Sequence, residues 1–173
     1  MIADGYANLQ EKIAKLISDL HDPDGLKRMK ARMALIHIGW EAVPGLIKVV
    51  NDETGTPRWE AIEALEKIRD PSAADALIDA LHDNDTNIRW AASNALIELD
   101  RAGLKSLLEA LTRDFGSASF REVAHHILHV LNDRGRLLPK EVDVFRALEG
   151  AEPAVQAPWA AEAALEDMLS LEK

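Results

Sequence analysis

The stretch that decides the fold is Asp83–Leu99, DNDTNIRWAASNALIEL. It runs from an acidic turn to an arginine and then into a helix with small and apolar residues on one face. The same arrangement recurs with arginines at intervals of 30, 31 and 32 residues, at Arg28, Arg58, Arg89 and Arg121. A leucine follows each arginine seven residues later, at Leu35, Leu65, Leu96 and Leu128. A period of this length is typical of a solenoid of stacked repeats.

Each arginine also has an aspartate before it. The aspartates lie six or seven residues earlier, at Asp22, Asp52, Asp83 and Asp114. A turn carboxylate can accept backbone N–H groups, and a guanidinium can bind carboxylates of its own and of a neighbouring repeat. We interpret these eight residues as a structural arginine ladder. Within it, Arg89 should be substantially buried and bonded to Asp83 or to a carboxylate of the adjoining repeat.

Between these turns, apolar residues recur at helical spacing. The first helices carry Ile13, Leu16, Ile17 and Leu20, and the cluster returns around Leu46, Leu77 and Leu107. The second helices should start near Leu26, Pro57, Asn87 and Ala118. Alanine pairs such as Ala92 and Ala95 permit close helix approach and mark the buried seam. The prediction is an all-α solenoid of about five stacked antiparallel helix pairs, with four regular pairs in residues 1–135.

The pattern resembles HEAT repeats, in the short form of the phycobilin-lyase-like group. The resemblance rests on Pro44 in EAVPGLIKVV and on the repeated turn aspartates and arginines, and it covers about residues 6–132. It implies a curved superhelix with the second helices on the concave side. It implies no single function, since such repeats serve scaffolds, adaptors and a few enzymes.

Residues 136–173 depart from the repeat. We expect a degenerate fifth pair or cap, with an Ala/Pro-rich loop at 150–158. From Pro158 onward, PWAAEAALEDML aligns with RWAASNALIELD, so Trp159 matches Trp90 and Leu165 matches Leu96. The alternative is a tethered amphipathic helix that docks elsewhere.

Composition excludes several classes of protein. A net charge of −10 disfavours nucleic-acid binding, which requires a basic face. The chain has no cysteine, so it has no disulfide framework and no thiolate chemistry. No apolar run approaches the length of a membrane span, and the N-terminus lacks a basic region typical of secretion signals. We therefore expect a cytoplasmic protein without membrane or nucleic-acid partners.

An apolar band is predicted on the outward side of the second helices. Its members are Met29, Met33, Ile36, Trp40, Trp59, Ile62, Trp90 and Ile97. Such a band indicates a groove for a partner's helix or extended segment. Glu63, Glu66 and Glu98 flank it and would select a basic rim on that partner. The alternative is that the tryptophans pack on neighbouring helices and are core.

One other cluster has possible chemistry. Glu122, His126 and His129 share one helical face, with His125 beside them, and carboxylate plus imidazole can ligate zinc, iron or manganese. All these ligands come from a single helix, however, so the alternative is a solvated polar patch that responds to pH.

No phosphate-binding glycine loop, nucleophile elbow or cysteine metal motif occurs. The leading interpretation is a non-enzymatic scaffold or adaptor that binds a protein segment and needs no cofactor. The alternative is a lyase-like or metal-assisted enzyme, or an enzyme subunit, acting at the concave face. By analogy with the resembled group, Trp59, Trp90, Glu63 and Glu66 would then hold a tetrapyrrole.

Overall fold

The computed structural model describes residues 2–113 and 116–171, with side chains from residue 7 onward. Within these residues the elements are all helical, which confirms the predicted all-α fold. The chain divides into two compact units, Met1–Ala95 and Leu96–Lys173, and the division falls inside helix α6.

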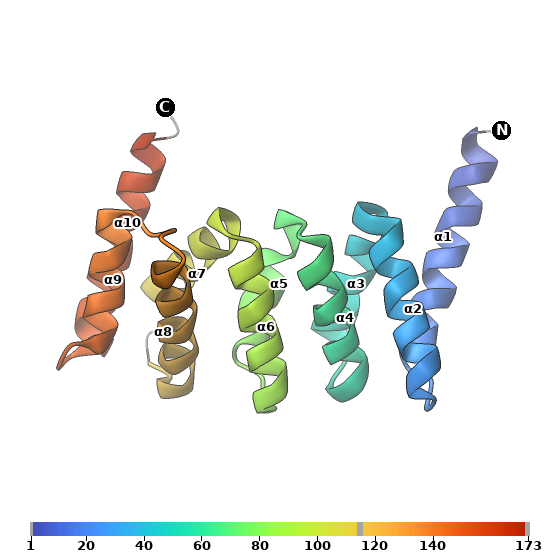
Figure 1. Ribbon diagram of the computed structural model, residues 1–173, viewed down its shortest axis with the longest axis horizontal. Helices are drawn as coiled ribbons and strands as arrows, with labels where there is room; N and C mark the ends of the chain where they lie inside the picture. The colour runs from blue at the N-terminus through green and yellow to red at the C-terminus, as the bar shows by residue number, and fades with distance from the viewer. Residues whose placement is uncertain (1, 114–115, 172–173) are drawn as a thin grey trace. The chain divides into compact units, whose positions relative to one another are not determined.

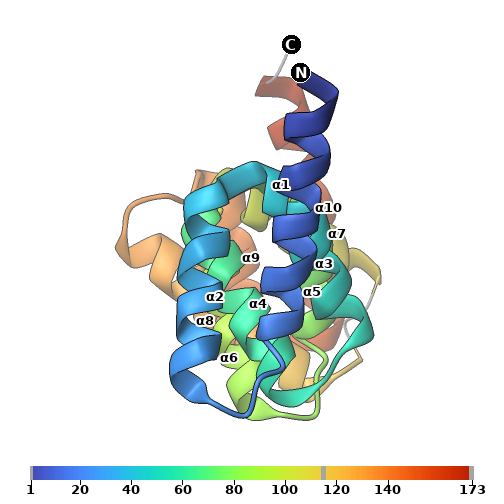
Figure 2. The same cartoon turned by 90° about the vertical axis from the view of Figure 1, so that its right-hand side faces the viewer.

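The first unit contains the helix pairs of the first repeats. Its elements are α1 (Ile2–Asp19), α2 (Gly25–Ile38), η1 (Gly39–Ala42), α3 (Val43–Asp52), α4 (Gly55–Ile68), η2 (Pro71–Ala73), α5 (Ala74–Ala80) and most of α6 (Thr86–Glu98). The first helices α1, α3 and α5 lie in one layer, and the second helices α2 and α4 lie in the other (Figures 1 and 2). Consecutive helices of each layer pack on one another, α1 on α3 and α2 on α4.

Aspartates in the turns end one helix and begin the next. The carboxylate of Asp22 accepts the Asp24 N–H at 2.8 Å, and Asp24 caps α2 by accepting the Leu26 N–H at 2.9 Å. Sixty-one residues later, Asp83 accepts from Asp85 N at 2.7 Å, and Asp85 accepts from Asn87 N at 2.8 Å. These bonds satisfy N–H groups that a helix start leaves without partners. The repeated Asp-x-Asp pattern thus places the starts of α2 and α6.

The predicted seam forms the core. The leucines seven residues after the arginines are fully buried: Leu35, Leu65, Leu96 and Leu128. The alanines before them, Ala31, Ala61, Ala92 and Ala124, are at most 2% exposed. Small side chains at these positions let the helices approach closely, and the leucines then fill the space between layers.

The second unit contains the last helix pairs. Its further elements are α7 (Arg101–Arg113), α8 (Ala118–Asp133), α9 (Pro139–Glu149) and α10 (Pro153–Leu171). Gly103 sits where α7 crosses the end of α6, and a Cβ there would lie 2.1 Å from the Leu96 carbonyl oxygen. Only glycine allows that approach without displacing backbone.

The fifth pair differs from the expectation in two ways. The loop predicted at 150–158 is shorter, because α10 begins at Pro153 and contains Pro158. The two helices of this pair also pack on the opposite layers from those of a regular repeat. The earlier helix, α9, packs on the second helix α8, whereas the later helix, α10, packs on the first helix α7 and on α9 (Figure 2). The buried face of α10 includes a stripe of small residues, Ala157, Ala161 and Ala164, which permit close approach of the neighbouring helices. The alignment of Trp159 with Trp90 therefore does not describe equivalent positions in the layers.

One stretch of helical backbone, Gly25–Asp52, is long and apolar enough by composition to cross a membrane, which corrects the expectation from the sequence. The stretch is not one rod. It comprises α2, η1 and α3 in succession, and α2 ends at Gly39, whose φ is +81°. Core helices of compact domains pass the same compositional criterion, so the stretch is weak evidence for a membrane span.

Candidate functional site

The arginines of the ladder bind mainly to backbone carbonyls. Arg28 Nη1 donates to the carbonyl oxygens of Asp22 at 2.8 Å and Pro23 at 3.1 Å. Arg89 Nη1 makes the same pair of bonds, to Asp83 at 2.8 Å and Asn84 at 3.2 Å. Arg89 is half-buried and donates to the Asp83 carbonyl oxygen rather than to the expected Asp83 carboxylate. The carboxylate instead accepts from Asp85 N in the turn and from Arg58 of the preceding repeat. The guanidinium thus closes the turn that precedes its own helix.

In the first unit, arginines of the ladder reach two carboxylates of the following repeat. Arg58 Nη1 donates to the Asp83 carboxylate, as expected for a residue that joins adjacent repeats. The other carboxylate is Glu60, which is 4% exposed and which the sequence analysis did not single out. It accepts from Arg28 Nε at 3.2 Å and from Arg32 Nη1 at 2.8 Å, so it fastens α2 to α4. Its signal in the sequence was weak, since one glutamate on a helix with Glu63 and Glu66 looks like part of a solvated face.

The remaining ladder positions do not repeat this geometry. Asp52 is exposed, and within the described residues its side chain has no hydrogen bond or ion pair. Glu53 beside it instead pairs with His21, with 3.4 Å between Nε2 and Oε1. Arg121 is half-buried and donates to the Gly116 carbonyl at 3.1 Å. Asp114 lies outside the described residues.

The most exposed apolar surface is a stripe along α2 and η1, here called the α2 stripe. It comprises Leu26, Met29, Met33 and Trp40, which are 53%, 44%, 57% and 68% exposed. Leu26, Met29 and Met33 recur at helical spacing, so their side chains point to one side of α2, and Trp40 follows in η1 beyond the end of that helix. Three of them belong to the predicted band, and Ile36 next to them is half-buried. Large apolar side chains gathered on one exposed face are typical of an interaction surface.

The other members of the predicted band differ in exposure, and two of them are buried. Ile62 is 0% exposed and Ile97 is 4% exposed, so both belong to the core and correct the expectation. Trp59 is half-buried beneath Arg32, whose guanidinium carbon lies 5.3 Å from the ring centroid. Trp90 is 40% exposed. The exposed part of the predicted band is therefore limited to residues of α2 and η1 and to Trp90.

Acidic side chains lie on the neighbouring helix α4. Glu63 is five residues after Arg58, as Met33 is five residues after Arg28, so it occupies the equivalent position. Burial raises the pKa of Glu63, and the nearby charge of Glu66 raises it further, while Arg32 acts in the opposite direction. A cation on a partner would stabilise the ionised form of this carboxylate.

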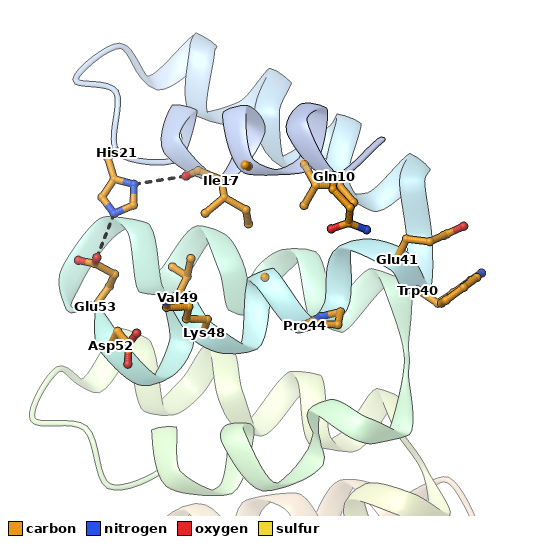
Figure 3. Close-up of a pocket in the computed structure, with 13 residues that line it drawn as sticks. Gln10, Ile17, His21, Trp40, Glu41, Pro44, Lys48, Val49, Asp52 and Glu53 are labelled. Carbon is orange, nitrogen blue, oxygen red and sulfur yellow. Dashed lines mark hydrogen bonds and ion pairs between the residues drawn. The ribbon is translucent and has the colours of Figure 1, made fainter. Parts of the chain in front are cut away.

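A separate cleft of about 570 Å³ opens on the layer of first helices (Figure 3). It lies between α1 and α3, with Ile13, Ile17 and Val49 as its apolar floor. His21 lies at one end, where it pairs with Glu53, and Trp40 lies at the other end (Figure 3). The sequence pattern gives no sign of this cleft, because its lining comes mainly from first helices, whose apolar residues have the spacing of a buried core.

Two histidines of α8, His125 and His129, lie against Phe145 of α9. The His125 ring lies 5.2 Å from that of Phe145, and His129 approaches the same ring edge-on at 5.9 Å. His129 Nδ1 also pairs with Asp133 at 3.2 Å, and Glu122 is exposed. Burial lowers the pKa of His126, with smaller contributions from His129 and His125.

Among the described residues, no three side chains of metal-ligand type gather closely enough to hold an ion. The predicted site at Glu122, His126 and His129 is therefore not formed in this structure. The reason is geometric: residues spread over two turns of one helix do not converge without ligands from a second element.

Comparisons with known proteins identify the class to which this geometry belongs. The family model for HEAT repeats matches residues 13–97 and 43–132. Together these segments span more than half of the chain, so the protein belongs to the HEAT-repeat family, as the sequence pattern indicated.

One solved structure is similar over nearly the whole chain. It is that of the complex of CpcE and CpcF of phycocyanin lyase from Nostoc sp. PCC7120, a chain of which is 26% identical with a TM-score of 0.57. The likeness covers 89% of this chain and 98% of that chain. No curated protein matches the chain.

Proposed function

We propose that this HEAT-repeat protein is a non-enzymatic interaction module whose α2 stripe binds an amphipathic helix with a basic flank. The observation that carries the proposal is the exposure of four large apolar side chains along α2 and η1, three of them on one side of α2. Burying Met33 and Trp40 against a partner would remove apolar surface from water. This burial is the main source of affinity at the centre of such interfaces.

The choice of a basic flank follows from α4. Glu63 and Glu66 repel one another and have only partial compensation from Arg32 and Lys67. A lysine or arginine on the partner would favour the charged form of Glu63 and lower its pKa on binding. Affinity should therefore fall as the pH falls through the raised pKa of Glu63, because a protonated carboxyl no longer attracts the cation.

The experiment uses a fluorescein-labelled synthetic helix with leucines at i, i+3 and i+7 and lysines along one flank. Fluorescence anisotropy measures its affinity for the full chain. Met33→Ser should weaken binding about tenfold or more, since an interface anchor commonly contributes about 2 kcal/mol. Glu63→Gln with Glu66→Gln should weaken the lysine-flanked helix and leave a neutral, glutamine-flanked helix unaffected.

The matched control is Asp79→Ala, an exposed change on α5 away from the α2 stripe. It should leave the affinity unchanged. Equal binding by the wild type and by Met33→Ser would refute the proposal, as would a preference for a glutamate-flanked helix over the lysine-flanked one.

The likeness to the phycocyanin lyase complex favours a second candidate, a lyase-like subunit that works with another chain. On this hypothesis Trp59, Trp90, Glu63 and Glu66 would contact a linear tetrapyrrole. Titration of the protein with a free bilin, followed by visible absorbance and fluorescence, tests it. A bound, spectrally shifted chromophore that Trp90→Ala releases supports this candidate; an unchanged bilin spectrum excludes direct chromophore binding.

A further inference from the structure

A cleft of about 600 Å³ in the second unit combines positive charge with an apolar wall. It lies between the start of α7, the connection from α8 to α9, and the end of α10. Its lining includes Arg101, Lys105, Arg136, Leu138, Met168 and Leu171. Clefts of this size commonly hold small organic ligands. Three cations around one cleft are unexpected in a chain whose net charge is −10.

The cations are only partly neutralised. Arg101 Nη1 donates to both oxygens of the buried Glu141, at 2.7 and 2.9 Å. Arg136 Nη1 pairs with Asp100 at 3.2 Å. Within the described residues, Lys105 has no hydrogen bond or ion pair, and neither do Nε and Nη2 of Arg101. The two carboxylates balance two of the three cations, so one positive charge remains for a ligand.

The position of these cations on the helix strengthens the positive potential. Arg101 begins α7, Lys105 follows one turn later, and the first turn holds no acidic residue. The start of a helix already carries partial positive charge from its free N–H groups, so cations there are unfavourable unless anions lie beside them; Glu141 and Asp100 compensate Arg101 and Arg136, whereas Lys105 has no such partner among the described residues. An anion bound beside Arg101 and Lys105 would relieve this repulsion.

The other wall is apolar. Met168 of α10 is 6% exposed, whereas Leu138 and Leu171 are 36% and 67% exposed. We propose that this cleft binds a monocarboxylate with an apolar tail. The carboxylate would accept hydrogen bonds from Lys105 Nζ and from the free edge of the Arg101 guanidinium, and the tail would cover Leu138, Met168 and Leu171. A single negative charge matches the single uncompensated cation, and a guanidinium edge matches the two oxygens of a carboxylate.

The test compares octanoate, 1-octanol and acetate with the full chain. Amide chemical shifts in ¹⁵N-labelled protein report both affinity and location. Octanoate should shift residues near 101–105, 136–138 and 168–171, and it should bind at least about tenfold more tightly than the alcohol or acetate, because each lacks one of the two interactions. Its affinity should also fall with added salt.

Lys105→Gln is the decisive variant, because it removes a cation that has no partner to lose. It should weaken octanoate binding about tenfold and leave 1-octanol unaffected. Lys140→Gln, an exposed lysine of α9 outside the cleft, is the matched control. Arg101→Gln is less informative because it would also leave the buried Glu141 carboxylate without its arginine partner.

Three results would overturn the proposal. They are equal affinity for octanoate and octanol, unchanged octanoate affinity in Lys105→Gln, and absence of shifts around the cleft at millimolar octanoate. A separate arm uses vesicles of phosphatidylglycerol. Binding to vesicles without binding to free octanoate would identify a membrane-surface contact instead and would likewise refute the small-ligand site.

Discussion

Replacing Glu60 with glutamine tests directly what holds α2 on α4. The Glu60 side chain is 5% exposed and accepts from Arg28 Nε at 3.2 Å and Arg32 Nη1 at 2.8 Å. Glu60→Gln keeps the size and shape of the side chain but removes its charge. One of the two guanidinium groups then loses its acceptor, and both lose the attraction of a buried carboxylate.

The expected cost follows from the burial of both partners. Removing one member of a fully buried ion pair costs about 3–5 kcal/mol. Here the arginine side chains retain 23% and 19% of their exposure, so water recovers part of the loss, and the glutamine oxygen still accepts one bond. We expect the free energy of unfolding to fall by about 2–3 kcal/mol. For a chain of this length, the melting temperature should fall by roughly 4–12 °C.

Urea titration at pH 7, followed by far-ultraviolet circular dichroism, measures the effect. The spectrum of folded Glu60→Gln should match that of the wild type, because the helices keep their hydrogen bonds. Glu11→Gln, an exposed change on α1, is the matched control and should alter stability by less than about 0.5 kcal/mol. If Glu60→Gln costs no more than this control, the buried pair does not stabilise the stack and the reasoning is refuted.

Three further changes probe other parts of the structure. Gly103→Ala should destabilise the protein strongly in thermal unfolding, since its methyl group would meet the Leu96 carbonyl at 2.1 Å; an unchanged melting temperature would contradict that close approach. Glu63→Gln should raise the urea midpoint at pH 7 but not at pH 4. The folded state binds the Glu63 proton more tightly than the unfolded state, so stability falls as the pH rises above the unfolded pKa of 4.5, and the full cost of ionisation is present above the raised pKa of the folded state; an identical gain at both pH values would contradict this assignment. Ile62→Ala should cost about 2–5 kcal/mol, whereas Met33→Ala should cost little; similar losses would show that the burial assigned to these two residues is wrong.

The sequence predicted the repeat well because the repeat is a local property. The recurrence of Arg28, Arg58 and Arg89 with a leucine seven residues later needs only a helix period and a turn. The starts of α2 and α6 are also marked locally, by Asp-x-Asp turns. Burial of Leu35, Leu65 and Leu96 then follows, because one face of an amphipathic helix must pack against something.

The candidate site was predicted less well because exposure depends on neighbours. Met33 and Ile62 both lie on second helices near the same side, yet one is 57% exposed and the other 0% exposed. The difference arises from packing between adjacent helices, which periodicity along one helix does not contain. For the same reason Glu60 looked like a surface residue until Arg28 and Arg32 of the preceding repeat were placed against it.

The sequence by itself determined the helical repeat, the turn chemistry and the identity of the buried seam, since all three depend on spacings of a few residues. Tertiary structure decided which apolar side chains remain exposed, and it placed α10 against α7 although the sequence aligned α10 with second helices. It also brought Arg101, Arg136 and Met168 around one cleft from three distant segments. Contacts of that kind join residues far apart in the chain, and their energies depend on how whole helices pack. They therefore produce no periodic pattern in the sequence.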